Sequence, residues 1–331
     1  METAEHVGIV RSSGGNATSI STCITAHKNA LGAVLHNGIA RGHRGNPAAS
    51  LAVEQLFGLP VLISGLATLV LTKKEEGLIE QHHKETIRNL QRLLHGTPTP
   101  VVCFLAGTLP GSAHVHLRQL SIFGMISRLS GNFLQRYALD LFQTGPPPFK
   151  SWFHQIYNLF DKYKLPSPLQ LLEHPLPKLQ YKKLVRSKVI SFWETSLRLE
   201  AAPLKSLEFF RPAFMSLNST YPIWTTSGSS PAKVAMATIQ AQMLSGRYRT
   251  ESLCSNWRKQ TSGACLLSPA CSLFTEDLHH ILRWCTALTP TRDKLLNFTE
   301  KYCDNVPSIV SDLLHEFVTT SNSSFCHFII D

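Results

Sequence analysis

Apolar residues recur every three or four positions along most of this chain, which is the spacing of one face of an α-helix. The clearest case begins at Thr72, where the sequence TKKE predicts a capping box at the start of a long amphipathic helix. Its apolar positions at helical spacing are Leu78, Ile79, Ile87, Leu90, Leu93 and Leu94. Only the opening HVGIVR alternates apolar and polar residues, as a short strand does. The pattern therefore predicts a mainly α fold.

Proline and glycine divide this helical pattern into segments. Asn46 and Pro47 predict the start of one helix, and Gly246 is a suitable residue to end another. Three consecutive prolines in TGPPPF interrupt any helix there. We therefore expect a bundle of helices, a second helical region and a small terminal module. The predicted boundaries are a strand and first helix at 1–45, a helical domain at 46–143, a Pro-rich linker at 144–149, a helical connector at 150–246, and a cysteine-containing region with C-terminal helices at 247–331.

One strongly apolar stretch has the length of a short membrane-spanning helix. It runs from Gln55 to Thr72 without a charged residue. Gly58, Pro60 and Gly65 interrupt it, and no aromatic belt follows. We therefore expect a buried core helix kinked at Pro60, and no membrane partner.

The bulk composition limits the class of protein. A chain of 331 residues with 43% hydrophobic residues is long enough and apolar enough for two or more folded cores. Its eight cysteines are too sparse for a disulfide scaffold, and the N-terminal METAEHVGIVRSSGG lacks the apolar segment of a signal peptide. We therefore expect reduced thiols and an intracellular protein, in the cytoplasm, the nucleus or both. The formal net charge of +10 favours an anionic partner.

One basic cluster lies in the segment PKLQYKKLVRSKV, which contains no acidic residue. Lys178, Lys182 and Arg186 are spaced four residues apart, so they are expected to share one helix face. We predict that Lys182, Lys183 and Arg186 bind nucleic-acid phosphates. An ordinary solvated helix face is the alternative.

A second basic cluster flanks the cysteines near the end of the chain. Its basic residues are interleaved with aromatic ones, which suits single-stranded nucleic acid because cations neutralise phosphates and aromatic rings stack on bases. The residues predicted to bind nucleic acid here are Arg247, Arg249, Trp257, Arg258 and Lys259. Solvated charges and core aromatic residues are the alternative. The predicted partner is RNA or single-stranded DNA, and the sequence does not determine the oligomeric state.

Three cysteines and one histidine form the strongest candidate site, with the pattern C-x5-C-x8-H-x4-C. The four residues are Cys265, Cys271, His280 and Cys285. Thiolates and an imidazole are the ligands of a tetrahedral structural zinc site, and four protein ligands leave no open position for catalysis. We therefore predict one structural zinc ion. The alternatives are ordinary buried thiols, His279 in place of His280, or Cys254 in place of Cys265.

The last two of these ligands fall on a predicted short helix. Thr275 is predicted as its N-cap, with Glu276 and Asp277 in the first turn, where negative charge is favourable. His280 and Cys285 are five positions apart. They can therefore share a metal ion only if the helix tightens or ends at Cys285.

Six longer segments carry a family resemblance. They are HVGIVRS, RGHRGNPAASLAVEQLFGLPVLISGL, LAGTLPGSAHVHLRQLSIFGMISRL, SWFHQIYNLFDKYKLPSP, MLSGRYRTESLCSNWR and DLHHILRWCTALTPTR. In this order, across nearly the whole chain, they resemble the C-terminal part of the reverse-transcriptase polyprotein of a non-LTR (LINE-like) retrotransposon. The first is similar to the strand that leaves the palm, the second to the thumb helix, and the last two to a terminal CCHC zinc knuckle. His280 aligns with the histidine of the family pattern, and His279 with a glutamate.

The resemblance implies a thumb-like domain at 46–143 and a terminal zinc knuckle, both of which bind nucleic acid in the family. The family's palm holds two catalytic metal ions through an aromatic-x-Asp-Asp turn, and this sequence contains no Asp-Asp pair. We therefore expect a truncated fragment that binds nucleic acid and has no polymerase activity alone.

Three other interpretations remain open. In the first, the chain is a host-retained helical protein-interaction module. In the second, it is a degenerate fragment without function. In the third, it is a subunit that is active only with a separately encoded palm. The aromatic residues that favour the interaction module are Trp152, Phe153, Tyr157 and Phe160.

Overall fold

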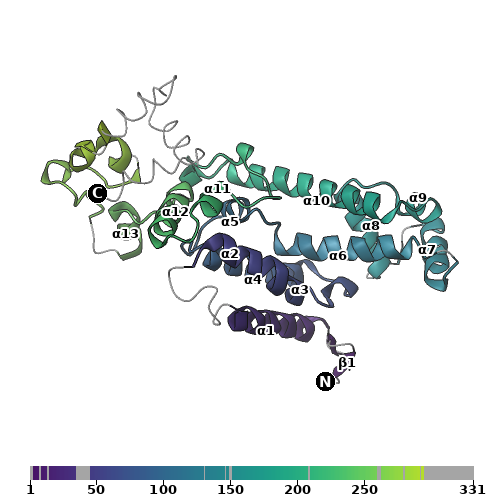
Figure 1. The fold of residues 1–331 in the computed structure, drawn as a ribbon. Helices are drawn as coiled ribbons and strands as arrows, with labels where there is room; N and C mark the ends of the chain where they lie inside the picture. The colour runs from purple at the N-terminus through teal and green to yellow at the C-terminus, as the bar shows by residue number, and fades with distance from the viewer. Residues whose placement is uncertain are drawn as a thin grey trace.

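The protein is mainly α-helical, as predicted (Figure 1). The computed structural model describes residues 3–6, 9–12, 15–34, 45–129, 131–145, 147–148, 151–207, 209–258, 262–278, 280–290 and 292–293. The α-helices are α1 (Ala17–Val34), α2 (Pro47–Val53), α3 (Leu59–Leu62), α4 (Lys73–Leu90), α5 (Thr99–Ala106), α6 (Gly111–Ile126), α7 (Phe133–Gln143), α8 (Trp152–Lys162), α9 (Pro168–Glu173), α10 (Lys178–Ala201), α11 (Pro222–Thr226), α12 (Pro231–Leu244) and α13 (Glu251–Arg258).

The N-terminal segment forms a two-stranded antiparallel sheet. Strand β1 (Thr3–His6) pairs with β2 (Ile9–Ser12), with Thr3 opposite Ser12 and His6 opposite Ile9. The predicted single strand HVGIVR is therefore wrong in extent, because His6 ends one strand and Ile9 begins the next. Antiparallel pairing provides hydrogen-bond partners that one isolated strand lacks.

The apolar stretch after α2 forms a broken helix with one face buried and the other exposed. A π-helical turn at Glu54–Gly58 follows α2 directly, and α3 begins at the next residue with Pro60 in its first turn. Gly65 ends this region with a positive φ of 74°, which favours glycine. The predicted interruption near Pro60 is confirmed, but the prediction of a buried helix is wrong for Leu56 and Phe57, which are 69% and 55% exposed. Within the described residues, no helix is long and apolar enough to cross a membrane.

Helix α4 begins with the predicted capping box. The backbone N–H of Glu75 donates to Thr72 Oγ1 at 3.3 Å, and the backbone N–H of Thr72 donates to Glu75 Oε2 at 2.7 Å. Each side chain therefore satisfies a backbone donor that the first helical turn leaves without a partner.

One hydrophobic core extends from α2 to α12. Its aromatic centre is Phe123 of α6, whose ring lies 5.0 Å from that of Phe160 on α8 and 6.1 Å from that of Phe142 on α7. The Pro-rich segment 144–149 lies between α7 and α8, so helices on both sides of the predicted linker contribute to the same core.

The packing of α6 against α10 requires a glycine. Tyr181 of α10 is buried and donates its hydroxyl hydrogen to the backbone carbonyl of Leu120 at 2.8 Å. A Cβ atom at Gly124 would lie 2.1 Å from the ring of Tyr181. The two helices, which run side by side in Figure 1, can therefore approach this closely only because Gly124 has no side chain.

Helix α1 packs against α3 and α4 through a second, smaller core. Beside it, His27 Nε2 lies 3.0 Å from Glu54 Oε2, and His27 Nδ1 lies 2.9 Å from His82 Nε2. Both members of the imidazole–carboxylate pair are fully buried. Gly58 borders the pair, and a side chain there would collide with the carboxylate. Polar contacts as well as apolar ones therefore hold α1 in place.

Candidate metal centre and basic groove

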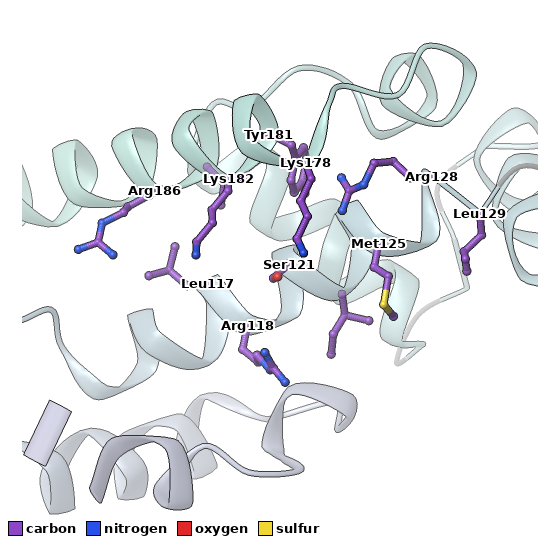
Figure 2. A pocket seen from close by; sticks show the side chains of 12 residues that line it. Leu117, Arg118, Ser121, Met125, Arg128, Leu129, Lys178, Tyr181, Lys182 and Arg186 are labelled. Atoms are coloured by element: carbon purple, nitrogen blue, oxygen red, sulfur yellow. The ribbon is translucent and has the colours of Figure 1, made fainter. Parts of the chain in front are cut away.

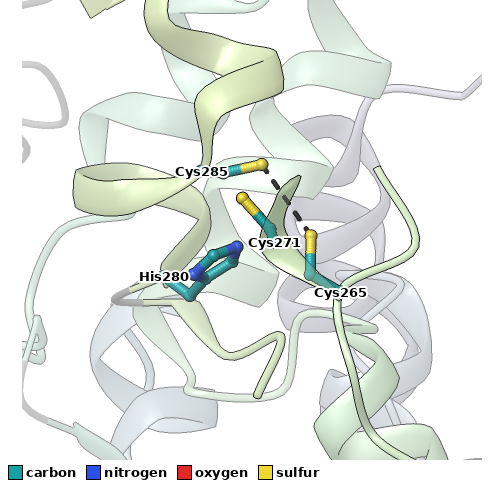
Figure 3. Close-up of side chains that lie close together, drawn as sticks. All are labelled: Cys265, Cys271, His280 and Cys285. Carbon is teal, nitrogen blue, oxygen red and sulfur yellow. Dashed lines mark hydrogen bonds between the residues drawn. The ribbon is translucent and has the colours of Figure 1, made fainter. Parts of the chain in front are cut away.

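The structure brings together the four residues predicted as metal ligands. The side chains of Cys265, Cys271, His280 and Cys285 are all buried, and their ligand atoms lie within 4.8 Å of one another (Figure 3). The sulfur atoms of Cys265 and Cys285 are 3.8 Å apart. Cys254 lies on α13 and is not part of this group. His279 lies outside the described residues.

A short turn accounts for the wide spacing between the first two cysteines. Ala264 forms an antiparallel bridge with Thr275, and the backbone N–H of Cys265 donates to the carbonyl of Phe274 at 2.9 Å. Between these contacts, a 3₁₀ turn at Pro269–Cys271 returns the chain toward its starting point. The five intervening residues therefore form a loop that closes on itself.

The second pair of ligands lies at the two ends of a π-helical turn at His280–Trp284. The backbone N–H of Cys285 donates to the carbonyl of His280 at 2.7 Å, which is the five-residue bond of a π-turn. Of the two predicted ways for these side chains to meet, the structure has the second: the π-turn ends at Trp284, just before Cys285. The turn is wider than an α-helical turn, not tighter.

The predicted cap of this turn is also wrong. Asp277 caps it, because its Oδ1 accepts a hydrogen bond from the backbone N–H of His280 at 2.7 Å. Thr275 lies earlier, in the bridge to Ala264. A carboxylate at the start of a helical turn is favourable because the first N–H groups have no other acceptors.

Glu276 is buried and connects the cysteine-containing loop to α13. Its Oε1 accepts from the backbone N–H of Glu251 at 3.0 Å, and its Oε2 accepts from that of Leu266 at 3.2 Å. The backbone carbonyl of Glu276 also accepts from Ser252 at 3.1 Å. This residue was predicted to stabilise a helix by its charge, but it instead joins two segments through backbone hydrogen bonds.

The chemistry of the four side chains suits a metal ion. Among the described residues, His280 Nε2 is buried without a hydrogen-bond partner, which is costly unless a ligand such as a metal ion satisfies it. Hydrogen bonds from the Thr286 hydroxyl and backbone N–H lower the pKa of Cys271, which favours the thiolate. Burial raises the pKa of Cys265 in the absence of a cation. The group could therefore hold a metal ion.

The first predicted basic cluster lies in a groove between α6 and α10 (Figure 2). The groove has a volume of about 660 Å³. Lys178, Lys182 and Arg186 all line it, as their four-residue spacing predicts. Lys183 is exposed on α10 but does not line the groove. Its predicted role as a phosphate ligand therefore has no support from this arrangement.

Two cations that sequence reasoning missed complete the groove. Arg118 of α6 and Arg128, just beyond its end, also line it, and none of the described lining residues is a carboxylate. Within the described residues, none of these five cations forms an ion pair. Arg128 lies over the Tyr181 ring at 5.8 Å, and its Nη1 is buried without a hydrogen-bond partner. Arg186 donates to the neutral Asn218 Oδ1 at 2.8 Å.

The second predicted basic cluster is only partly described. Arg247 is half-buried and Arg249 is exposed. Trp257 and Arg258 lie on α13, but their side chains are outside the described part of the structure, as is the whole of Lys259. The predicted role of these five residues in binding stays a prediction.

The buried histidines around α4 were not predicted as a group. His83 lies beside His114, with ring centroids 5.4 Å apart, and His116 lies 3.1 Å from Glu76 Oε1. Burial lowers the pKa of His83 and lowers that of His114 to about 4. These histidines are therefore neutral in the folded protein near pH 7. Adjacent residues such as His82 and His83 face different helices, so sequence proximity gives no sign of their partners.

Comparisons with known proteins provide no assignment. No protein family, no curated protein and no solved structure matches this chain.

Proposed function

We propose that this chain binds RNA or single-stranded DNA, that its Cys₃His group holds one structural zinc ion, and that it has no polymerase activity alone. The observation that carries the proposal is the acid-free groove between α6 and α10, in which five cations have no ion-pair partner among the described residues. The resemblance to the C-terminal part of a non-LTR reverse-transcriptase polyprotein supports the same function. The proposal assigns no catalytic residue.

The donor set favours zinc among the metals. Three thiolates are soft ligands, and with one imidazole they form the tetrahedral set typical of structural zinc sites. All four ligands come from the protein and all are buried, so the site offers no open position to a substrate. The ligands must remain reduced, which agrees with the expected intracellular location.

The groove favours a polyanion over a small anion. The lysines and arginine of α10 are four residues apart, so successive side chains are separated by about 6 Å along the helix. Cations repeated at this interval can neutralise several phosphates of one strand, each releasing a counterion. Affinity of this kind decreases linearly with the logarithm of the salt concentration.

A salt titration tests the proposal. We expect the logarithm of the association constant for a single-stranded RNA to fall with log salt, by about 0.7 per neutralised phosphate. The double variant Lys182→Ala/Arg186→Ala should reduce this slope by about 1.4. Lys183→Ala/Lys188→Ala removes the same charge from the same helix outside the groove, and serves as the matched control.

Two outcomes would contradict the proposal. One is an affinity that does not change with salt for any RNA or DNA strand. The other is an equal loss of slope in the groove variant and the control variant, because general charge rather than the groove would then explain binding.

A protein-interaction module is the second candidate. Of the aromatic residues predicted to favour it, Phe153 and Phe160 are buried in the core and Trp152 is half-buried, leaving only Tyr157 exposed. A different observation supports it: Phe133 of α7 is 79% exposed. This candidate predicts a protein partner whose binding is lost in Phe133→Ser and is insensitive to salt.

A further inference from the structure

The floor of the basic groove is apolar. It consists of partly or fully buried side chains from both helices and one well-exposed methionine, Met125, which is 53% exposed. The apolar lining residues are Leu117, Ile122, Met125, Leu129, Tyr181 and Val185. Figure 2 shows the side chains of Lys178 and Lys182 extending from α10 toward α6, Lys178 toward Ser121 and Lys182 toward Leu117. The groove therefore has a cationic rim above an apolar surface.

The apolar surface continues beyond the cations. A second pocket of about 430 Å³ shares Arg118 and Ile122 with the groove and extends along α3 and the turn that follows it. Its other lining residues are Leu59, Pro60, Ile63, Ser64, Gly65, Ala67 and Thr68. In the part of the chain that the structure describes, no carboxylate lines either pocket. A ligand that fills both must be elongated.

A cationic rim above an apolar floor favours a polyanion that also has apolar surface. A nucleic-acid duplex presents phosphates on its outside and keeps its bases stacked within, so it has no apolar surface to offer the groove floor. Inorganic polyphosphate has none at all. A single strand has phosphates along one edge and flat, largely apolar base faces that are free to bind protein side chains. It therefore matches both the rim and the floor.

We propose that the groove between α6 and α10 binds a single strand with its bases turned in against the floor around Met125 and its phosphates on the α10 cations. The inference rests on the proposed nucleic-acid-binding function and adds to it a base-binding surface. Lys178, Lys182 and Arg186 hold the backbone. Arg118 lies where the two pockets meet, so it contacts the strand as it passes from one to the other.

Binding of base-carrying and abasic strands of equal length tests the inference at constant salt. Anisotropy of a labelled oligonucleotide measures the affinity. We expect the wild-type protein to bind the base-carrying strand about tenfold more tightly than the abasic strand, because base faces that cover the aliphatic floor remove apolar surface from water. Met125→Ser should remove most of this difference and leave the affinity for the abasic strand unchanged.

A matched control and a second measurement guard against misfolding. Leu179→Ser changes a side chain of α10 that is 71% exposed and does not line the groove, so it should leave both affinities unchanged. A strand that contains 4-thiouracil should form photo-crosslinks to the peptide containing Met125. Equal helix content and equal melting temperatures of the variants confirm that each has folded.

The failures of the two proposals are distinguishable. If the abasic strand binds as tightly as the base-carrying strand and Met125→Ser changes neither, the base-binding floor is overturned while phosphate binding stands. If neither strand binds, both proposals are overturned. If an acidic amphipathic peptide displaces the strand and binds more tightly than any strand, the groove is a protein-binding site.

Discussion

Two regions of the protein bury very different side chains. One is the helical body, which comprises α2 to α12, and the other is the cysteine module, residues 262–293. The body packs large side chains such as Trp224, Phe104 and Phe123 in one continuous core. The core of the module consists of three cysteines with Leu288 packed against them. Several of its larger apolar side chains remain exposed, and they are Leu266, Leu267, Leu273, Phe274 and Trp284. Burial of apolar surface stabilises the body, whereas the module has too little of it to fold by that means.

The two regions of this chain therefore depend on separate sources of stability. If the module is held by a metal ion, its folding follows metal occupancy, while the folding of the body follows packing. Perturbing one region should therefore leave the other intact. The predictions that follow test this separation.

Removal of the metal ligands should have the largest effect. We expect purified protein to carry one equivalent of zinc, and Cys271→Ser/His280→Ala to carry none. Because structural zinc contributes on the order of 10–16 kcal/mol to folding, the module should unfold in this variant. Hydrogen exchange should show loss of protection across residues 262–293 and unchanged protection in α4, α6 and α10.

Cys254→Ser is the control for this experiment, since Cys254 lies outside the group and the variant should keep its zinc. A wild-type protein that is fully folded without any metal would contradict the prediction. Loss of zinc in Cys254→Ser would mean that the ligand set is wrong.

A cavity in the core of the helical body should destabilise the body and leave the metal content of the module unchanged. Phe123→Ala removes a fully buried ring that contacts two other rings, and it should lower the free energy of unfolding by about 3–5 kcal/mol. Chemical denaturation monitored by circular dichroism measures the change. The zinc content of the folded protein should remain at one equivalent. Zinc loss under native conditions would show that the two regions are coupled.

Acid should weaken the body through its buried histidines. Burial lowers the pKa of His114 from 6.5 to about 4, and it also lowers that of His83. The unfolded state therefore binds more protons between these pH values, so the free energy of unfolding falls as pH decreases from about 6.5 toward 4. Each histidine contributes at most about 1.4 kcal/mol per pH unit. Denaturation at several pH values measures this slope.

The metal-free background Cys271→Ser/His280→Ala excludes zinc release as the cause of this slope. In that background, His114→Gln should make the slope shallower. His95→Gln should not change it, because His95 is exposed. An identical slope in all three proteins would show that the buried histidines do not control the acid response.

The smallest effect is expected at the start of α4. Thr72→Ala removes the side-chain acceptor for the backbone N–H of Glu75 and should cost about 1 kcal/mol. Lys74→Ala, in the same turn, leaves the capping box intact and should change stability less. The same denaturation measurement resolves both, and neither variant should alter zinc content.

Sequence patterns predicted features that depend on residues close together in the chain. The capping box at Thr72 and the shared face of Lys178, Lys182 and Arg186 follow from helical geometry alone. The grouping of the four metal-ligand candidates followed from residue type and spacing. In each case residues close together in the sequence determine the feature, so it can be predicted without knowing the rest of the fold.

Features that depend on distant contacts were not predictable in this way. Arg118 and Arg128 join the α10 cations because Gly124 lets α6 approach Tyr181, a contact between residues far apart in sequence. The π-turn at His280 was missed because local propensity favours an ordinary helical turn, whereas the site requires two side chains five positions apart to converge.

The buried carboxylate of Glu276 has a consequence for the neighbouring helix. It holds the backbone of Glu251, the first residue of α13, and the same side chain holds Leu266 beside a metal-ligand candidate. When the module unfolds, α13 therefore loses this anchor, although the backbone N–H of Leu253 keeps its own acceptor in Thr250 Oγ1. If the Cys₃His group holds a metal ion, removal of that ion should therefore also loosen α13, a helix that supplies none of the four ligands.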